Sequence, residues 1–208
     1  MSSDDARIDP FLEIIIVTYK RTKQLRSLVA SLSCQTNMGF SIKIIHDGPS
    51  GETRECVLEL QELYPELILF YEESEKRFND YGHSLRSKGV QDATQEYCLL
   101  TNDDNYYVPI FIDEISKTIQ QENPDIIYFD MVHNYRFEDL PNPVGYQTLI
   151  TEPRIDRIDM GSFIFRTQLG KSIGFTDRSY KADGVFFEAL TAVTTNIVKI
   201  PKVLFVHN

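Results

Sequence analysis

Strand-like and helix-like segments alternate through the first 130 residues of the chain. Five runs rich in β-branched and aliphatic residues predict strands. They lie at residues 13–21, 40–53, 67–73, 96–105 and 125–132, and the first, second and fourth end in polar loops. Between them, apolar residues at helical spacing predict helices at 22–36, 54–66, 81–93 and 109–124. This alternation predicts an α/β fold with an open, mostly parallel twisted sheet and helices on both faces.

The pattern changes after Met131. Residues 133–167 are typical of loops and short strands, and the segment "TQLGKSIGF" follows. A helix at about 184–194 and a strand at 197–206 come last. Since no linker-like stretch separates the two parts, we expect residues 1–208 to form a single domain, with halves at about 1–130 and 131–208 and a small α+β portion in the second half.

Charge and cysteine usage limit the possible partners and the compartment. The 21 basic and 31 acidic residues give a net charge of −10, which argues against a nucleic-acid binder. The N-terminal segment "MSSDDARIDPF" lacks a signal-peptide pattern, and the longest apolar run, "IIIV", is too short to span a membrane. Cys34, Cys56 and Cys98 have no metal-ligand spacing, so we expect buried, reduced thiols and a cytoplasmic protein.

Polar residues gather where three of the predicted strands end. Ligands of open α/β sheets bind beyond the carboxyl ends of the strands, so these residues should meet at one rim. They are Thr18, Tyr19, Lys20 and Arg21 at the end of the first strand, His46 and Asp47 toward the end of the second, and Asn102, Asp103 and Asp104 at the end of the fourth.

This set of side chains suits a nucleotide. Carboxylates cannot touch phosphate directly, but they can hold Mg²⁺ or Mn²⁺ that does. The sequence contains neither G-x-G-x-x-G nor a P-loop, so side chains and a metal would have to hold the nucleotide. Taken singly, each residue also fits an ordinary turn or cap.

Three ordered segments resemble the family 2 glycosyltransferases of the GT-A fold, which are Rossmann-like. They are "IIIVTYKRTKQLRSLVASLSCQT", "IKIIHDGPSGET" and "EYCLLTNDDNYYVP". A weaker similarity continues in "DMGSFIFRTQLGKSIGF", "KADGVFFEAL" and "VLFVHN". The resemblance implies a metal-dependent, inverting transfer of a sugar from a nucleotide-sugar donor, typically a UDP-sugar, to an acceptor hydroxyl. The first half would bind the donor and the second half the acceptor.

The resemblance also assigns roles in donor binding. In sequence order, the donor residues would be Thr18, Tyr19 and Arg21 around the base, Asp47 accepting a hydrogen bond from the base, Arg86 (with Lys88) at the diphosphate, Asn102, Asp103 near the ribose, and Gly161 and Ser162 near the donor sugar or acceptor. Asn102 replaces the first Asp of the common D-x-D motif.

Metal binding and base catalysis are assigned in the same way. Asp104 and His207 would hold Mn²⁺ or Mg²⁺, although His207 also fits a frayed chain terminus. Asp183 matches the catalytic aspartate, with Ala182 in place of the acid that usually precedes it. Asp183 also suits a helix N-cap before "GVFFEAL". His46 is more typical of a satisfied polar side chain than of a ligand.

Two other functions use similar chemistry. A sugar-1-phosphate nucleotidylyltransferase has a related sheet, but it usually has a glycine-rich loop after the first strand, which "VTYKRTKQ" lacks. A catalytically inactive nucleotide- or sugar-binding module would fit the Asn102 and Ala182 departures. The acceptor could be a saccharide, a lipid-linked molecule or another hydroxyl compound. The sequence reveals neither the acceptor nor the oligomeric state.

Overall fold

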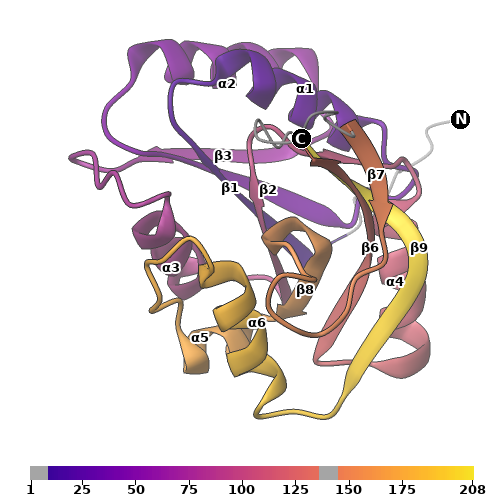
Figure 1. Ribbon diagram of the computed structural model, residues 1–208. Helices are drawn as coiled ribbons and strands as arrows, with labels where there is room; N and C mark the ends of the chain where they lie inside the picture. Colours follow the sequence, from indigo (N-terminus) through magenta and orange to yellow (C-terminus); the bar gives the residue numbers. More distant parts are fainter. Residues whose placement is uncertain (1–8, 136–144) are drawn as a thin grey trace, which may run out of the picture.

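The computed structural model describes residues 9–135 and 145–208. Most of the N-terminal segment considered above therefore lies outside the described residues. Within them, a nine-stranded sheet has the order β3-β2-β1-β4-β8-β6-β9-β5, and β7 pairs with β6. Helices cover both faces of this curled sheet (Figure 1). The α/β fold predicted from the sequence is confirmed.

The first half contains the parallel part of the sheet. Strands β1, β2, β3 and β4 pair in parallel, with β1 between β2 and β4. The elements of this half are β1 (Leu12–Thr18), α1 (Thr22–Ser33), β2 (Phe40–His46), α2 (Gly51–Leu63), β3 (Ile68–Glu73), α3 (His83–Asp92), β4 (Tyr97–Asn102), β5 (Tyr106–Tyr107), α4 (Phe111–Glu122) and β6 (Ile126–Tyr135).

The second half makes the sheet mixed. Strand β8 lies between β4 and β6 and is antiparallel to both, while β9 is parallel to β6. Parallel neighbouring strands need a crossover connection, usually a helix. No α-helix is described between β6 and β8, which agrees with their antiparallel pairing. The elements of this half are β7 (Gly145–Leu149), the 3₁₀ turn η1 (Met160–Ser162), β8 (Phe163–Arg166), α5 (Thr167–Ile173), α6 (Ala182–Thr191) and β9 (Ile197–His207).

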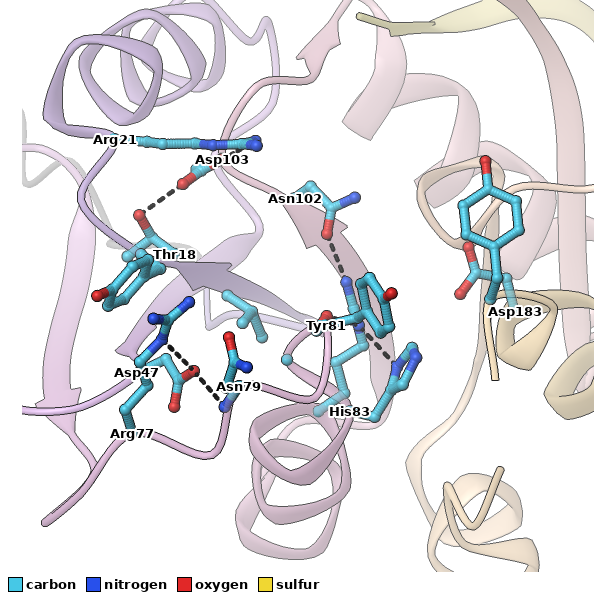
Figure 2. Close-up of a pocket in the computed structure, with 15 residues that line it drawn as sticks. Thr18, Arg21, Asp47, Arg77, Asn79, Tyr81, His83, Asn102, Asp103 and Asp183 are labelled. Atoms are coloured by element: carbon cyan, nitrogen blue, oxygen red, sulfur yellow. Dashed lines mark hydrogen bonds and ion pairs between the residues drawn. The ribbon is translucent and has the colours of Figure 1, made fainter. Parts of the chain in front are cut away.

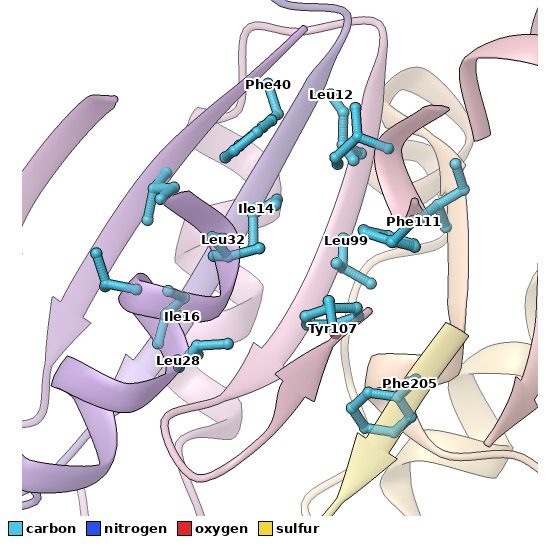
Figure 3. Close-up of a cluster of buried hydrophobic side chains, with 14 of the residues drawn as sticks. Leu12, Ile14, Ile16, Leu28, Leu32, Phe40, Leu99, Tyr107, Phe111 and Phe205 are labelled. Carbon is cyan, nitrogen blue, oxygen red and sulfur yellow. The ribbon is translucent and has the colours of Figure 1, made fainter. Parts of the chain in front are cut away.

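Alternation along the strands divides the core between the two faces. On β1, Leu12, Ile14 and Ile16 belong to the cluster under α1, α2 and α4, part of which Figure 3 shows. Ile15 and Val17 belong to the cluster under α3, α5 and α6. Because β1 is covered on both faces, its sequence is a continuous apolar run. This packing fixes the point where β1 ends and its polar residues begin.

The described residues also test two predictions about individual segments. All three cysteines are free, but only Cys56 and Cys98 are buried. The expectation for Cys34 was wrong, because this residue follows the last turn of α1, where it is exposed. No helix in residues 9–135 or 145–208 is both long and apolar enough to cross a membrane.

Candidate active site

A hollow of about 540 Å³ lies beyond the carboxyl ends of the parallel strands. β1 and β4 supply Thr18 and Asn102 at their last positions, and Asp103 directly follows β4. Asp183 lines the same hollow from α6, opposite Thr18 and Asp103 (Figure 2). Residues from both halves of the chain thus face one cavity.

Asp103 is a buried carboxylate held by its neighbours. Thr18 Oγ1 donates to its Oδ2 at 2.6 Å, and Arg21 Nη1 lies 3.4 Å from its Oδ1. Burial raises the pKa of Asp103 to about 6, against the hydrogen bond from Thr18, which lowers it. The charge of Asp104 raises the pKa further, and Arg21 lowers it. A carboxylate fixed in this way can accept a hydrogen bond from a ligand hydroxyl.

Asp104 turns toward a second, adjoining hollow of about 880 Å³. Its Oδ2 accepts a hydrogen bond of 2.6 Å from Arg21 Nη1. Arg21, Asn102 and Asp183 line both hollows, so the two cavities meet along these residues. Arg21 therefore bridges both carboxylates of the Asp103–Asp104 pair at the boundary between the cavities.

Tyr19 and Arg77 form the end of the first hollow that lies near β2. The Arg77 guanidinium lies 3.8 Å from the centre of the Tyr19 ring, a cation–π contact. Asp47 accepts hydrogen bonds from the backbone N–H groups of Phe78 and Asn79, at 2.7 and 3.1 Å. Both oxygens of Asp47 thus hold the loop that carries Arg77, and the residue lines the hollow with that loop.

Arg86 is a buried cation at the base of the first hollow. Its guanidinium donates to Asn102 Oδ1, to the Tyr81 carbonyl and to His83 Nδ1. Its Nε has no hydrogen-bond partner among the described residues. Burial lowers the pKa of Arg86, and nearby carboxylates, Asp183 first, raise it. A buried guanidinium with donors to spare suits an anionic ligand group.

Asp183 lies in the first turn of α6, two residues after the N-cap, Lys181. The N-cap interpretation was therefore wrong. Burial raises its pKa to about 6, and the charge of Asp159 adds to the rise. Arg86, the backbone N–H of Met160 and His207 oppose it. A carboxyl group with such a pKa can both accept and release a proton near neutral pH.

Gly161 and Ser162 position Asp159 instead of lining either hollow. The Gly161 N–H donates to Asp159 Oδ1, and Ser162 Oγ bonds to the backbone of Asp159 in a capping box. A Cβ on Gly161 would lie 2.5 Å from the Phe205 ring, so this turn requires glycine. The "DMGS" turn therefore presents Asp159 to the second hollow.

His207 reaches the second hollow from β9. Its Nε2 lies 3.6 Å from Asp159 Oδ2, and its ring stacks on His133 with the ring centres 4.4 Å apart. Its Nδ1 is buried without a hydrogen-bond partner among the described residues. Carboxylate and imidazole donors suit Mn²⁺, and Asp104 lines the same hollow.

These donors do not form a ready-made metal site. Among the described residues, no three His, Cys, Asp or Glu side chains are close enough together to hold a metal. Asp104 is instead paired with Arg21. The donor chemistry fits a divalent cation, provided that Arg21 releases Asp104 and the ligand supplies the remaining oxygens.

The structure brings most of the predicted residues together and separates a few. The predicted residues that line one or both hollows are Thr18, Tyr19, Arg21, Asp47, Arg86, Asn102, Asp103, Asp104, Asp183 and His207. Lys88 is on the surface, paired with Glu72 and Asp92, so the expectation that it contacts a diphosphate was wrong. His46 is satisfied as expected: its Nε2 accepts from the Lys20 N–H, and its Nδ1 bonds to the Gly48 carbonyl.

Sequence reasoning missed Arg77, Asn79, His133 and Asp159. Arg77 and Asn79 lie in a loop after β3, which carries no strand-end signal. His133 faces His207 only because β6 and β9 pair in that register. Asp159 carried a usable signal, since an Asp before "MGS" is typical of a capped turn.

The sequence model of glycosyl transferase family 2 matches residues 13–176. The uncharacterized glycosyltransferase YwdF of Bacillus subtilis (strain 168) is 35% identical over 120 residues, which cover 57% of this chain and 41% of YwdF. The chain thus spans less than half the length of this curated relative.

Solved structures show the same fold. Residues 1–349 of S. aureus TarS superpose with a TM-score of 0.75 at 19% identity, covering 95% of this chain and 60% of that one. TarS has also been solved with UDP-GlcNAc. The mannosyltransferase PcManGT from Pyrobaculum calidifontis, in complex with GDP-Man and Mn²⁺, has a TM-score of 0.74 at 16% identity and covers 96% of this chain and 57% of that one. At these identities the likeness establishes the GT-A fold alone.

Proposed function

Because the chain belongs to glycosyl transferase family 2, we propose that it transfers a sugar from a nucleoside-diphosphate donor to an acceptor hydroxyl with inversion. A UDP-sugar is our preferred donor, as in the TarS complex with UDP-GlcNAc. The observation that carries the proposal is the arrangement of Thr18, Asp103 and Asp183 around one hollow. Hydrogen-bonding groups at the strand ends thus face a carboxylate with a raised pKa.

In this proposal the first hollow holds the donor. Tyr19 and Arg77 offer flat surfaces for the base, and Asp103 accepts a hydrogen bond from a ribose hydroxyl. Asp47 holds the Arg77 loop through two backbone hydrogen bonds and would also accept one from the base, because each carboxylate oxygen has a second lone pair. Arg86 lies at the base of the same hollow and would attract the diphosphate.

Asp183 would act as the general base. It takes the proton of the acceptor hydroxyl while that oxygen forms a bond to the anomeric carbon. The bond from the anomeric carbon to the phosphate oxygen breaks, and the nucleoside diphosphate leaves with the electron pair. A pKa of about 6 leaves Asp183 mostly ionised at pH 7 and near the operating pH, which favours base catalysis.

Mn²⁺ or Mg²⁺ completes the proposal, with Asp104 and His207 as its protein ligands. When bound, the cation would stabilise the charge that develops on the departing diphosphate. Arg21 would leave Asp104 and remain available to the phosphates at the boundary of the two hollows. PcManGT, which shares the fold, carries Mn²⁺ together with GDP-Man.

We further propose that the two halves work as one domain, because Asn102 and Asp183 face the same cavity from different halves. The free Cys56 and Cys98 thiols fit a reducing, cytoplasmic compartment.

Thermal unfolding with UDP, GDP and other nucleoside diphosphates, with and without Mn²⁺, tests the proposal. A ligand at 100 times its Kd stabilises by about 2.7 kcal/mol, which for this chain length is a rise of roughly 5–10 °C in Tm. We expect such a rise with UDP and Mn²⁺ together, followed by UDP release from a UDP-sugar. Release of pyrophosphate from UTP and a sugar 1-phosphate would instead indicate a nucleotidylyltransferase, and nucleotide binding without turnover an inactive module. No shift with any nucleotide would contradict the proposal.

A further inference from the structure

Tyr180 is the most exposed large hydrophobic side chain among the described residues. It is 90% exposed and directly precedes Lys181, the N-cap of α6. A ring so exposed adds little to the stability of the fold and leaves a face open to a ligand. It lines both hollows, at the boundary between them.

Tyr180 and Asp183 lie on the same short segment. Tyr180 comes three residues before Asp183 along the chain, and both residues line both hollows. An acceptor that enters from the second hollow and brings a hydroxyl to Asp183 therefore reaches the boundary where Tyr180 stands. The ring is in the right region to contact the acceptor next to the reacting hydroxyl.

The charges of the second hollow narrow the choice of acceptor. Its lining includes four carboxylates, from Asp104, Asp156, Asp159 and Asp183. The Lys and Arg side chains among its described lining residues are Arg21 and Lys181, and both are already paired. Arg21 bonds to Asp104 at 2.6 Å, and Lys181 Nζ lies 3.7 Å from Asp156. In the complex Mn²⁺ and Arg21 would face the diphosphate of the donor, so an acceptor that carries a phosphate or carboxylate near its reacting end would still meet the carboxylates of Asp159 and Asp183 and be repelled.

The remaining lining suits a molecule with apolar faces and polar edges. Met131, Leu149 and Ile158 supply apolar surface. Asn134 and the carboxylates supply acceptors for hydroxyl groups. A pyranose ring has this character, because its C–H groups form an apolar face and its hydroxyls point outward. An exposed tyrosine ring offers a flat, rigid surface for such a face.

We propose that the second hollow binds an uncharged saccharide acceptor and that Tyr180 is the platform on which its sugar ring stacks beside Asp183. This inference rests on the proposed function and narrows its acceptor to neutral sugars. Tyr180 is then a specificity-determining residue of the acceptor side.

The first experiment compares acceptors. UDP release from a UDP-sugar is measured with Mn²⁺ and a panel of methyl glycosides of hexoses and N-acetylhexosamines, the phosphorylated forms of the same sugars, and glycerol. We expect at least one neutral glycoside to accelerate release at least tenfold over donor hydrolysis, and the phosphorylated form and glycerol not to do so. Equal or better use of the phosphorylated sugar or of glycerol would overturn the inference, and so would hydrolysis that no glycoside accelerates.

The second experiment tests Tyr180 itself. Tyr180→Ala should raise the acceptor KM about tenfold with a smaller change in kcat, whereas Tyr180→Phe should keep a KM close to that of the wild type. Phe70→Ala, which truncates an exposed aromatic side chain on β3, is the matched control. An unchanged KM in Tyr180→Ala would overturn the platform.

The thermal shift with UDP and Mn²⁺ distinguishes a failure of this inference from a failure of the proposed function. Loss of acceptor preference with an intact nucleotide shift contradicts this inference alone. If the wild type shows neither a nucleotide shift nor hydrolysis of any donor, the proposed function itself fails.

Discussion

The carboxylates on the two walls of the first hollow have different partners. On the wall at the strand ends, Asp103 accepts a hydrogen bond from Thr18, and Asp47 accepts two from the backbone of the loop after β3. On the wall at α6, Asp183 meets the charge of a second carboxylate, Asp159. Both Asp103 and Asp183 are buried near a second carboxylate, but the Thr18 hydroxyl and Arg21 bond directly to Asp103.

This difference indicates which wall binds and which wall reacts. Satisfied carboxylates keep their positions when a ligand arrives, so they suit recognition. Burial next to a second carboxylate raises the pKa of both Asp103 and Asp183 to about 6, but Asp183 lines both hollows and can therefore reach an acceptor hydroxyl, which suits a general base. The comparison predicts that substitutions at the strand ends weaken donor binding, whereas substitution of Asp183 lowers turnover.

The largest effect should come from Asp183→Asn. Loss of a general base lowers turnover by about 10² to 10⁴-fold, while the donor-side contacts remain. Turnover is measured as nucleoside diphosphate release with saturating donor, and donor binding by thermal shift. Asp113→Asn on the surface of α4 is the control. Wild-type turnover in Asp183→Asn would remove this residue from the chemistry.

The same variant should be more stable than the wild type at high pH. Asp183 has a pKa of about 6 in the folded protein, against 3.8 ordinarily, so the folded state binds its proton more tightly than the unfolded chain does. Below about pH 4 the carboxyl is neutral in both states and nothing is lost. As the pH rises through 6, the free energy of unfolding of the wild type falls by up to about 3 kcal/mol. Solvent in the hollow screens the charge of Asp183 and makes this loss smaller.

Thermal unfolding of wild type and Asp183→Asn between pH 4 and pH 8 measures this effect. The variant should have the higher Tm at pH 8, by several degrees, and the gap should close toward pH 4. Asp103 also has a raised pKa, but it is present in both proteins and cancels in the difference. A gap that is the same at every pH would show that Asp183 carries no unfavourable charge.

Asp104→Ala should separate ligand binding from stability. The Arg21–Asp104 ion pair is partly exposed, so without ligand its loss should cost about 1 kcal/mol or less. With UDP and Mn²⁺, the expected rise of roughly 5–10 °C in Tm should disappear. Retention of the full Mn²⁺-dependent rise would show that Asp104 is not a metal ligand.

The smallest effect should come from Thr18→Val. It removes the hydroxyl that satisfies Asp103, and a buried carboxylate without this partner costs about 1–3 kcal/mol. Urea unfolding measures the loss, and Thr18→Ser, which keeps the hydroxyl, should recover most of it. If Val and Ser at this position are equally stable, the strand-end wall is not held by this hydrogen bond.

The sequence predicted the strand-end wall well because its residues are placed by local signals. Thr18, Asn102 and Asp103 each follow from the end of a strand, and a parallel sheet brings such ends together. The family resemblance identified Asp183 as the base. It did not reveal that Asp183 lies in the first turn of α6 and not at its N-cap.

The second hollow could not be read in this way, because its lining depends on long-range pairing. His133 meets His207 through the register of β6 and β9. Asp159 reaches the second hollow because Gly161 fits against Phe205 in a turn before an antiparallel strand. None of these contacts follows from spacing along the chain. Arg21, expected beside the base, instead bridges Asp103 and Asp104, and only side-chain geometry could reveal that contact.

The most direct test of the comparison is calorimetric titration of a UDP-sugar with Mn²⁺ into Asp183→Asn and Asp103→Asn, each against wild type. The account predicts that Asp183→Asn binds the donor within about threefold of the wild-type Kd, and that Asp103→Asn binds at least tenfold more weakly, a loss of about 1.4 kcal/mol. If Asp183→Asn lost donor affinity and Asp103→Asn kept it, the assignment of binding to the strand ends and chemistry to α6 would be contradicted.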